Sequence, residues 1–200
     1  MVVLTNTSNT KTMGYNFSMT IKPIVHNKEL KRINKMKIHI ITTGGTIEGL
    51  EHETLGQFQT KSPMSITELM KKLEILYDYI VKSIFFKDSR FITNEDRQIL
   101  ISEISKIKED KILITHGTLT MVQTVQYIGL YNLDKTIVLT GAFILGTDPN
   151  SDAVANLNFA MEAFEDLKNG TYIAMHNQVF NWDNVLKNVS ENRFERIIKS

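Results

Sequence analysis

The chain has 200 residues, of which 42% are hydrophobic and 22% are charged, a composition typical of a single soluble globular domain. It contains no cysteine, which excludes disulfides, zinc–thiolate sites and cysteine nucleophiles and fits a cytoplasmic protein. No apolar run reaches the roughly 18 residues of a membrane span, and the net charge of +1 gives no electrostatic reason to expect nucleic acid. We therefore expect neither a membrane nor a nucleic acid among its partners.

The first 35 residues differ in composition from the rest of the chain. They carry six Lys or Arg and one acid, whereas residues 36–200 carry 17 basic and 21 acidic residues. They lack the apolar stretch of a secretory signal, and with a single Arg they make a poor transit peptide. We interpret residues 1–35 as a disordered leader, or as upstream sequence added by a mistaken start, and residues 36–200 as one domain. A basic tail that binds a membrane or RNA is the less favoured alternative.

Strand and helix patterns alternate along this domain. Short apolar runs predict strands at residues 37–43, 79–86, 111–115, 136–140 and 171–175. Capping residues and helical periodicity predict helices at about residues 65–73, 93–107, 118–128 and 151–167. Two of these helices open with capping-box spacing, Ser65 with Glu68 and Thr93 with Asp96. Alternating strands and helices imply an α/β fold, here a three-layer Rossmann-like domain with a mostly parallel sheet.

Turns rich in glycine and threonine follow two of the predicted strands, at residues 42–46 (TTGGT) and 115–118 (THGT). Ligands of open α/β sheets bind beyond the carboxyl ends of the strands, and glycine lets the backbone approach a ligand closely. We therefore expect Thr46 and Thr118 to face one crevice that suits a small carboxylate or phosphate, with a hydroxyl available as nucleophile. His116 is expected to orient its turn.

These turns have two other possible interpretations. Nucleotide binding has little support, because the chain has no G-x-x-x-x-G-K-[ST] motif and residues 44–49 do not fit G-x-G-x-x-G. Purely structural turns would be favoured for either segment alone. Two such turns at adjacent crossovers favour a site.

Several short segments carry a more specific pattern in chain order. Residues 43–47 are TGGTI and residues 115–121 are THGTLTM. Further segments are residues 87–89 (KDS), 138–142 (VLTGA), 151–153 (SDA) and 180–188 (FNWDNVLKN). Together they resemble landmarks of the bacterial-type L-asparaginase family, whose second signature is usually written T-H-G-T-D-T. The resemblance runs from Met36 to about Phe194 and covers only that family's larger, N-terminal domain, so we expect a short, single-domain asparaginase-like protein.

The resemblance implies a set of residue roles. Thr46 would be the nucleophile that attacks the side-chain amide of asparagine and forms an acyl-enzyme. Thr118 and Lys187 would form a second catalytic cluster, and Ser89 would bind the α-carboxylate of the substrate. Gly45 and Gly117 would contribute to substrate binding, because backbone N–H groups at the glycine turns can stabilise an oxyanion. The partner would be a small-molecule amide, no metal or organic cofactor is implied, and we expect a homodimer.

Two positions depart from the family pattern. Leu119 stands in the substrate site where the family has an aspartate that binds the α-amino group, and leucine can carry no charge. Residues 47–60 contain no tyrosine, although the family's activating tyrosine lies in this loop, and His52 or Glu53 is the candidate base in its place. Two interpretations remain open: an amidohydrolase, whose substrate can be an amide without an α-amino group, or a catalytically degenerate module that binds a small acid or amide.

Overall fold

In the computed structural model, residues 36–50, 64–73 and 77–198 are described. The chain divides into two units, Met1–Asn34 and Lys35–Ser200, and the described residues all belong to the second. The interpretation of residues 1–35 as a leader therefore falls outside the described residues.

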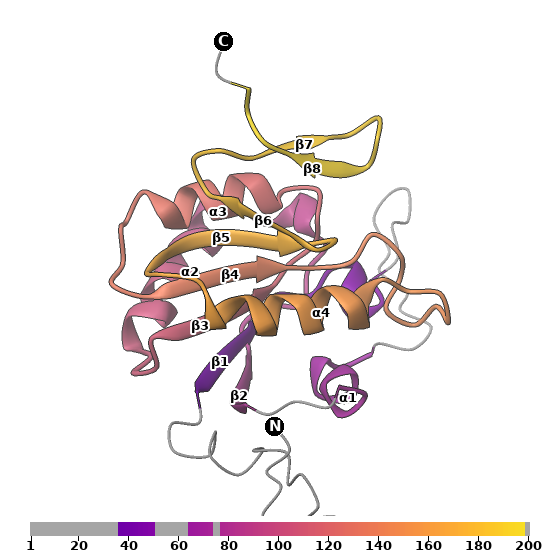
Figure 1. Ribbon diagram of the computed structural model, residues 1–200, viewed down its shortest axis with the longest axis horizontal. Coiled ribbons are helices and arrows are strands. Elements are labelled where there is room, and N and C mark those ends of the chain that lie inside the picture. The colour runs from indigo at the N-terminus through magenta and orange to yellow at the C-terminus, as the bar shows by residue number, and fades with distance from the viewer. Residues whose placement is uncertain (1–35, 51–63, 74–76, 199–200) are drawn as a thin grey trace, which may run out of the picture. The chain divides into compact units, whose positions relative to one another are not determined.

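A six-stranded sheet forms the centre of the domain (Figure 1). Its strand order is β2-β1-β3-β4-β5-β6, in which the first five strands are parallel and β6 is antiparallel to β5. The strands are β1 (Lys37–Thr42), β2 (Asp78–Ser83), β3 (Lys111–Thr115), β4 (Thr136–Thr140), β5 (Gly170–Met175) and β6 (Gln178–Asn181). The predicted strands correspond to β1–β5, so the predicted α/β class with a mostly parallel sheet is confirmed.

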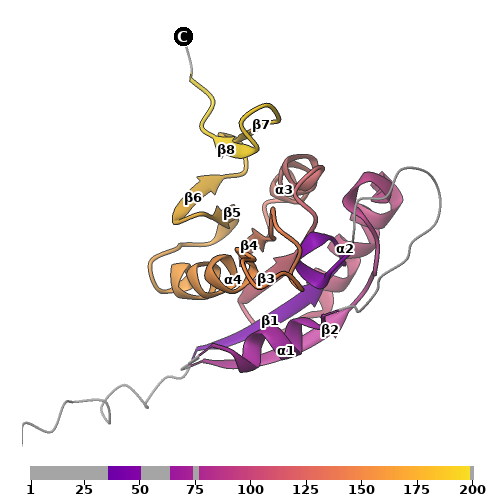
Figure 2. The same cartoon turned by 90° about the vertical axis from the view of Figure 1, so that its right-hand side faces the viewer.

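Helices cover both faces of the sheet, which gives three layers (Figure 2). On one face lie α2 (Asn94–Lys106) and α3 (Met121–Gly129), and on the other lie α1 (Ile66–Lys71) and α4 (Ala153–Glu162). Both predicted capping boxes are formed, by Ser65 at α1 and by Thr93 at α2. α3 begins later than predicted, because Thr118 and its neighbours form a turn.

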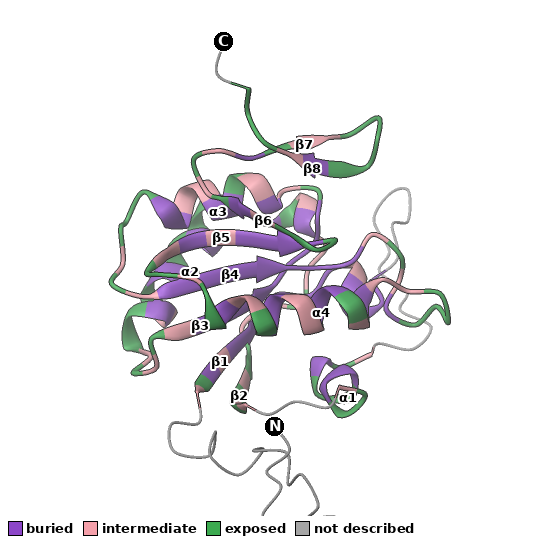
Figure 3. Cartoon of the chain, viewed as in Figure 1, coloured by how far each residue is buried: buried purple, intermediate pink, exposed green. Residues whose placement is uncertain are grey.

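Side chains on the central strands alternate between two apolar clusters, and these strands are buried on both faces (Figure 3). On β3, Ile112 and Ile114 pack on the side of α2 and α3, whereas Leu113 packs on the side of α1 and α4. Each such fully buried side chain stabilises the fold by about 1.5–3 kcal/mol. Because both faces are packed, the ends of these strands are held in fixed positions.

The carboxyl ends of three neighbouring strands carry threonines that lie side by side. Thr42 of β1 is in register with Thr115 of β3, which is in register with Thr140 of β4. The chain order reverses between β1 and β3, since β2 lies on one side of β1 and β3 on the other. Open α/β sheets bind ligands at such a switch point. The turns after β1 and β3 are therefore placed where a ligand site is expected.

The C-terminal part contains strands that the sequence patterns did not predict. β6 returns along β5, and β7 (Leu186–Asn188) pairs with β8 (Arg193–Glu195) in a separate two-stranded sheet. Within the described residues, the helices are too short or too polar to cross a membrane.

Candidate active site

The first threonine turn follows β1. Gly44 and Gly45 have φ angles of 91° and 85°, a conformation that favours glycine. The chain then forms a single 3₁₀ turn, Thr46–Glu48, in which Thr46 is partly exposed. The Thr43 backbone N–H and hydroxyl both donate to the Thr115 carbonyl oxygen, at 3.2 and 2.8 Å. These two hydrogen bonds tie the turn to the neighbouring strand.

A buried carboxyl group, that of Glu48, lies behind this first turn. Its Oε2 accepts a hydrogen bond from the Gly44 N–H at 2.7 Å. Burial raises the pKa of Glu48 to about 7, although hydrogen bonds from Gly44 and Thr42 act in the opposite direction. Glu48 was given no role from the sequence, so its place at the turn was missed. The position of Glu48 two residues after Thr46 was the one sequence feature that pointed to a place at this turn.

A buried histidine, His116, anchors the second threonine turn. Arg97 Nε donates to Thr124 Oγ1 at 3.1 Å, so the Thr124 hydroxyl is oriented to donate to His116 Nε2 at 3.0 Å. The Nδ1–H of His116 then donates to the Gly117 carbonyl oxygen at 2.8 Å. Burial lowers the pKa of His116 to about 4, which agrees with a neutral ring. The predicted role of His116 in orienting its turn is confirmed.

The two turns pack directly against each other through glycines. A Cβ atom on Gly45 would lie 2.6 Å from the Gly117 nitrogen, and a Cβ on Gly117 would lie 2.7 Å from Ser89 Oγ. A larger residue at either position would push the segments apart. Thr120 Oγ1 adds a hydrogen bond to the Ser89 carbonyl oxygen at 2.6 Å. Backbone contact of this kind brings three distant segments to one place.

Lys187 reaches the site from the β7–β8 hairpin. The hairpin is anchored by Phe194, which is buried in the core cluster of α2 and α3. The Phe194 ring lies 5.8 Å from that of Phe143 and 6.3 Å from that of Phe180, measured between centroids. Aromatic packing of this geometry fixes where β7 runs and so where the Lys187 side chain begins.

The Lys187 ammonium group pairs with the hydroxyl of the second turn. Lys187 Nζ donates to Thr118 Oγ1 at 2.9 Å and lies 5.1 Å from the centre of the Phe143 ring. Burial lowers the pKa of Lys187, and among the described residues no carboxylate forms an ion pair with it. A lysine whose charge is disfavoured is suited to accept a proton from a hydroxyl or a water.

The loop after β4 closes another wall of the site. Asp152 holds this loop, because its carboxylate accepts hydrogen bonds from the N–H groups of Phe143 and Ile144 at 2.9–3.1 Å. Gly146 N–H donates to the Thr46 carbonyl oxygen at 2.9 Å, which joins the loop to the first turn. Asp152 belongs to the SDA segment seen in the sequence, but only the structure shows what it holds.

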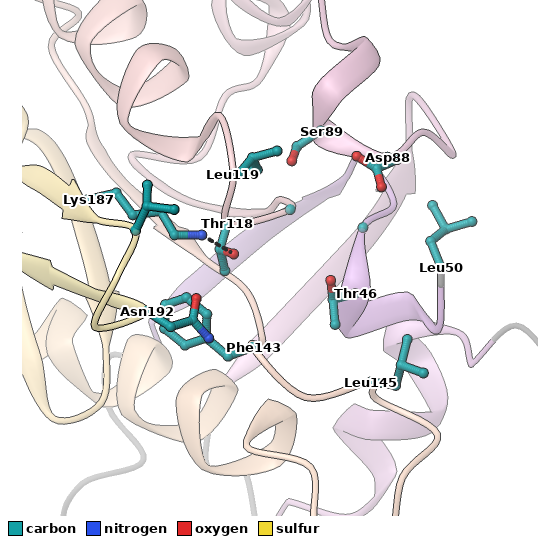
Figure 4. Close-up of a pocket in the computed structure, with 13 residues that line it drawn as sticks. Thr46, Leu50, Asp88, Ser89, Thr118, Leu119, Phe143, Leu145, Lys187 and Asn192 are labelled. Carbon is teal, nitrogen blue, oxygen red and sulfur yellow. Dashed lines mark hydrogen bonds between the residues drawn. The ribbon is translucent and has the colours of Figure 1, made fainter. Parts of the chain in front are cut away.

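A cavity of about 390 Å³ lies between these segments, within the usual range of small-molecule sites. Figure 4 shows Thr46 on one wall and the hydrogen-bonded Thr118 and Lys187 on another, facing the same space. Each predicted site residue lines it: Gly45, Thr46, Ser89, Gly117, Thr118, Leu119 and Lys187. The expectation that the two threonines face one crevice is confirmed.

Other residues that line the cavity had no assigned place in the sequence analysis. They are Leu50, Asp88, Phe143, Leu145, Val189 and Asn192. Most are apolar and lie in loops, where hydrophobic periodicity gives no signal. The candidate bases His52 and Glu53 lie outside the described residues. In the described part of the chain, no group of three or more His, Cys, Asp or Glu side chains is arranged to hold a metal ion.

Comparisons with known proteins agree with this geometry. The family model described as Asparaginase, N-terminal, matches residues 37–195. An L-asparaginase of Thermococcus kodakarensis is 30% identical over 152 residues, 72% of this chain and 45% of that protein. A probable periplasmic L-asparaginase of Haemophilus influenzae is 28% identical over 163 residues, 75% of this chain and 46% of that protein. The crystal structure of a probable cytoplasmic L-asparaginase from Campylobacter jejuni superposes with a TM-score of 0.70 at 28% identity, over 81% of this chain and 52% of that one.

The match covers most of this chain but only part of its relatives. The chain spans less than half the length of the two curated relatives. The matched residues 37–195 include both threonine turns and the hairpin that carries Lys187. The chain therefore belongs to the asparaginase family, and its residues 37–195 match the model of that family's N-terminal domain.

Proposed function

We propose that the protein is an asparaginase-type amidohydrolase, which hydrolyses the side-chain amide of asparagine or of a related small acid. One observation carries the proposal: Thr46 and the Thr118–Lys187 pair line the same cavity at the switch point of the sheet. Membership of the asparaginase family supports it independently.

In the proposed reaction Thr46 is the nucleophile. Its hydroxyl loses a proton, Oγ1 attacks the amide carbonyl carbon, the C–N bond breaks, and the departing nitrogen takes up one proton and leaves as ammonia. The acyl group is then held as an ester on Thr46. Water attacks this ester, the free carboxylic acid leaves, and the hydroxyl of Thr46 regains its proton. The balance is one amide and one water consumed for one acid and one ammonia formed.

The remaining site residues are proposed to support these steps. Lys187, with its lowered pKa and its bond to Thr118 Oγ1, moves the proton to or from the attacking group. Backbone N–H groups of the turns at Gly45 and Gly117 are the candidate donors to the oxyanion, because a glycine backbone can come close to the substrate. Ser89, almost fully buried at the cavity wall, is the candidate ligand of a substrate carboxylate.

Ammonia release from a panel of amides tests the proposal. The panel contains asparagine, glutamine and small ω-amides without an amino group, and Thr46→Ala is compared with wild type. We expect hydrolysis of at least one amide and a loss of at least about 10³-fold in kcat in the variant. Thr67→Ala, an exposed change on α1, is the control. Absence of ammonia from every amide, with aspartate or a related acid still raising the melting temperature, would instead identify a binding module.

We also propose a homodimer. In the described residues β2 forms an outer strand of the sheet, and it pairs only with β1. Exposed strand edges are natural sites of association. Light scattering during gel filtration should give twice the mass of the chain, and the mass of a single chain would contradict the proposal.

A cytoplasmic location is a further proposal. It is supported by the absence of cysteine from the sequence and by the relative in Campylobacter jejuni described as probably cytoplasmic. Cell fractionation of the native host, with the protein detected by antibody, should place it with cytoplasmic markers, and recovery with periplasmic markers would contradict this.

A further inference from the structure

The cavity offers no free negative charge among the described residues that line it. Asp88 is the one carboxylate in this set. Arg90 occupies both of its oxygens, with Nε 3.1 Å from Oδ1 and Nη2 3.0 Å from Oδ2, and the Arg90 N–H also donates to Oδ1 at 2.8 Å. The other ionisable side chain, Lys187, is cationic or neutral and never negative. A substrate ammonium group would therefore meet no available counter-charge on these walls.

The same walls present hydrocarbon to the substrate. Leu119 directly follows Thr118 in the second turn, and 40% of its surface stays exposed beside the cavity. Figure 4 shows Leu119 and Ser89, the candidate carboxylate ligand, among the residues that line the cavity, and Thr120, which follows Leu119, donates a hydrogen bond to the Ser89 carbonyl oxygen at 2.6 Å. Leu50, Leu145 and Val189 add further apolar surface. Exposed leucine and valine side chains at the mouth of a polar site indicate that they contact an apolar part of the ligand.

Charge and shape together favour one substrate class. An ammonium group placed beside Leu119 would lose hydration without gaining an ion pair, and Lys187 would repel it whenever that lysine is protonated. A hydrogen atom or a methyl group at the same position would lose nothing and would cover apolar surface. Resting on the proposed amidohydrolase function, we propose that the substrate is the ω-amide of a small carboxylic acid that carries hydrogen or hydrocarbon, and no ammonium group, on the side of Leu119.

Three matched amides test this proposal. L-Asparagine, succinamate and 2-methylsuccinamate differ only in the substituent beside the carboxylate, which is ammonium, hydrogen or methyl. We expect wild type to hydrolyse succinamate or its methyl analogue with a kcat/KM about tenfold or more above that for asparagine, because a desolvated and unpaired charge is costly.

Variants at Leu119 separate charge from size. Leu119→Asp should raise the kcat/KM ratio of asparagine to succinamate by about tenfold, because it supplies the missing counter-charge. In Leu119→Asn the new side chain has nearly the shape of aspartate but no charge, so this variant should leave the ratio close to that of wild type. Leu130→Asp places a carboxylate at an exposed position that does not line the cavity and should also leave the ratio close to wild type. Melting curves of each variant confirm that it is folded.

Binding of the acid products tests the selectivity of the cavity separately from amide hydrolysis. Calorimetric titration with succinate, 2-methylsuccinate and L-aspartate needs no turnover, and we expect both succinates to bind more tightly than aspartate. If no amide is hydrolysed but this order holds, amide hydrolysis is wrong and the apolar selectivity of the cavity stands. If asparagine is the best substrate, or aspartate the tightest ligand, the inference is overturned while Thr46-dependent hydrolysis is unaffected.

Discussion

The two threonine turns line one cavity but are supported by opposite kinds of buried group. Behind the turn of Thr46 lies an acid, Glu48, which bonds to the Gly44 N–H. Behind the turn of Thr118 lies a base, His116, which bonds to the Gly117 carbonyl oxygen. Burial drives both groups toward their neutral forms, raising one pKa to about 7 and lowering the other to about 4.

This difference separates a turn that responds to pH from one that does not. At neutral pH His116 is neutral and its hydrogen bonds are constant, whereas Glu48 is divided between its protonated and ionised forms. The threonines differ too. Thr118 has a lysine at hydrogen-bond distance, whereas within the described residues no basic side chain bonds to Thr46. The second turn is therefore the fixed part of the site, and the first is the part that responds to pH.

Removing the lysine of the second turn should have the largest effect. Lys187→Met keeps much of the side-chain length but cannot bond to Thr118 Oγ1, so we expect kcat for the best amide to fall by about 10²–10⁴-fold. Steady-state ammonia release measures it, with the exposed Lys72→Met as control. A loss below tenfold would show that the second turn is not the proton-transfer partner.

The Glu48→Gln variant tests the pH response of the first turn. Between its ordinary pKa of 4.5 and the folded value of about 7, the folded protein holds a proton that the unfolded chain has lost. The free energy of unfolding should therefore fall as pH rises through this window, by about 3 kcal/mol. His116 acts with the opposite sign, because its lowered pKa costs stability as pH falls from 6.5 toward 4.

Urea unfolding of wild type and Glu48→Gln from pH 4.5 to 8 isolates the carboxyl group, because His116 is common to both. The stability of wild type relative to the variant should decline across the window. Parallel curves for the two proteins would mean that Glu48 titrates as an ordinary surface acid.

The contact between the second turn and the Ser89 segment gives the smallest of these effects. A Cβ on Gly117 would lie 2.7 Å from Ser89 Oγ and 2.8 Å from Ser89 Cβ, so Gly117→Ala should cost about 1–3 kcal/mol of stability. Combining it with Ser89→Gly removes both opposing atoms and should recover much of that loss. Strictly additive effects of the two changes would show that the segments do not press on each other at this point.

The elements that local patterns determine were predictable from the sequence. The apolar runs of β1, β3 and β4 and the capping boxes at Ser65 and Thr93 each carry their own signal, and the structure contains all of them. β6 was missed because its hairpin turn is His176-Asn177, with φ angles of 50° and 57°, where Asn-Gly is the common signal. β7 and β8 have three residues each, too few for a period to show.

The site was predictable where residue type and strand end coincide, as at Thr46 and Thr118. Ser89 and Lys187 were implied instead by the resemblance to the asparaginase family, and all the predicted site residues line one cavity. Glu48 and Asp152 were missed because their roles depend on burial and on backbone N–H groups distant in space, which spacing alone does not reveal. The apolar lining from Phe143 and Val189 depends likewise on how loops fold over the sheet.

Trapping the acyl-enzyme decides whether Thr46 or Thr118 is the nucleophile. Wild type is mixed with its best amide, quenched in acid within the first turnover, digested and mapped by mass spectrometry. We expect an acyl group on the peptide that contains Thr46, and its loss in Thr46→Ala. An acyl group on Thr118 instead, or on Thr118 in the Thr46→Ala protein with hydrolysis intact, would contradict it.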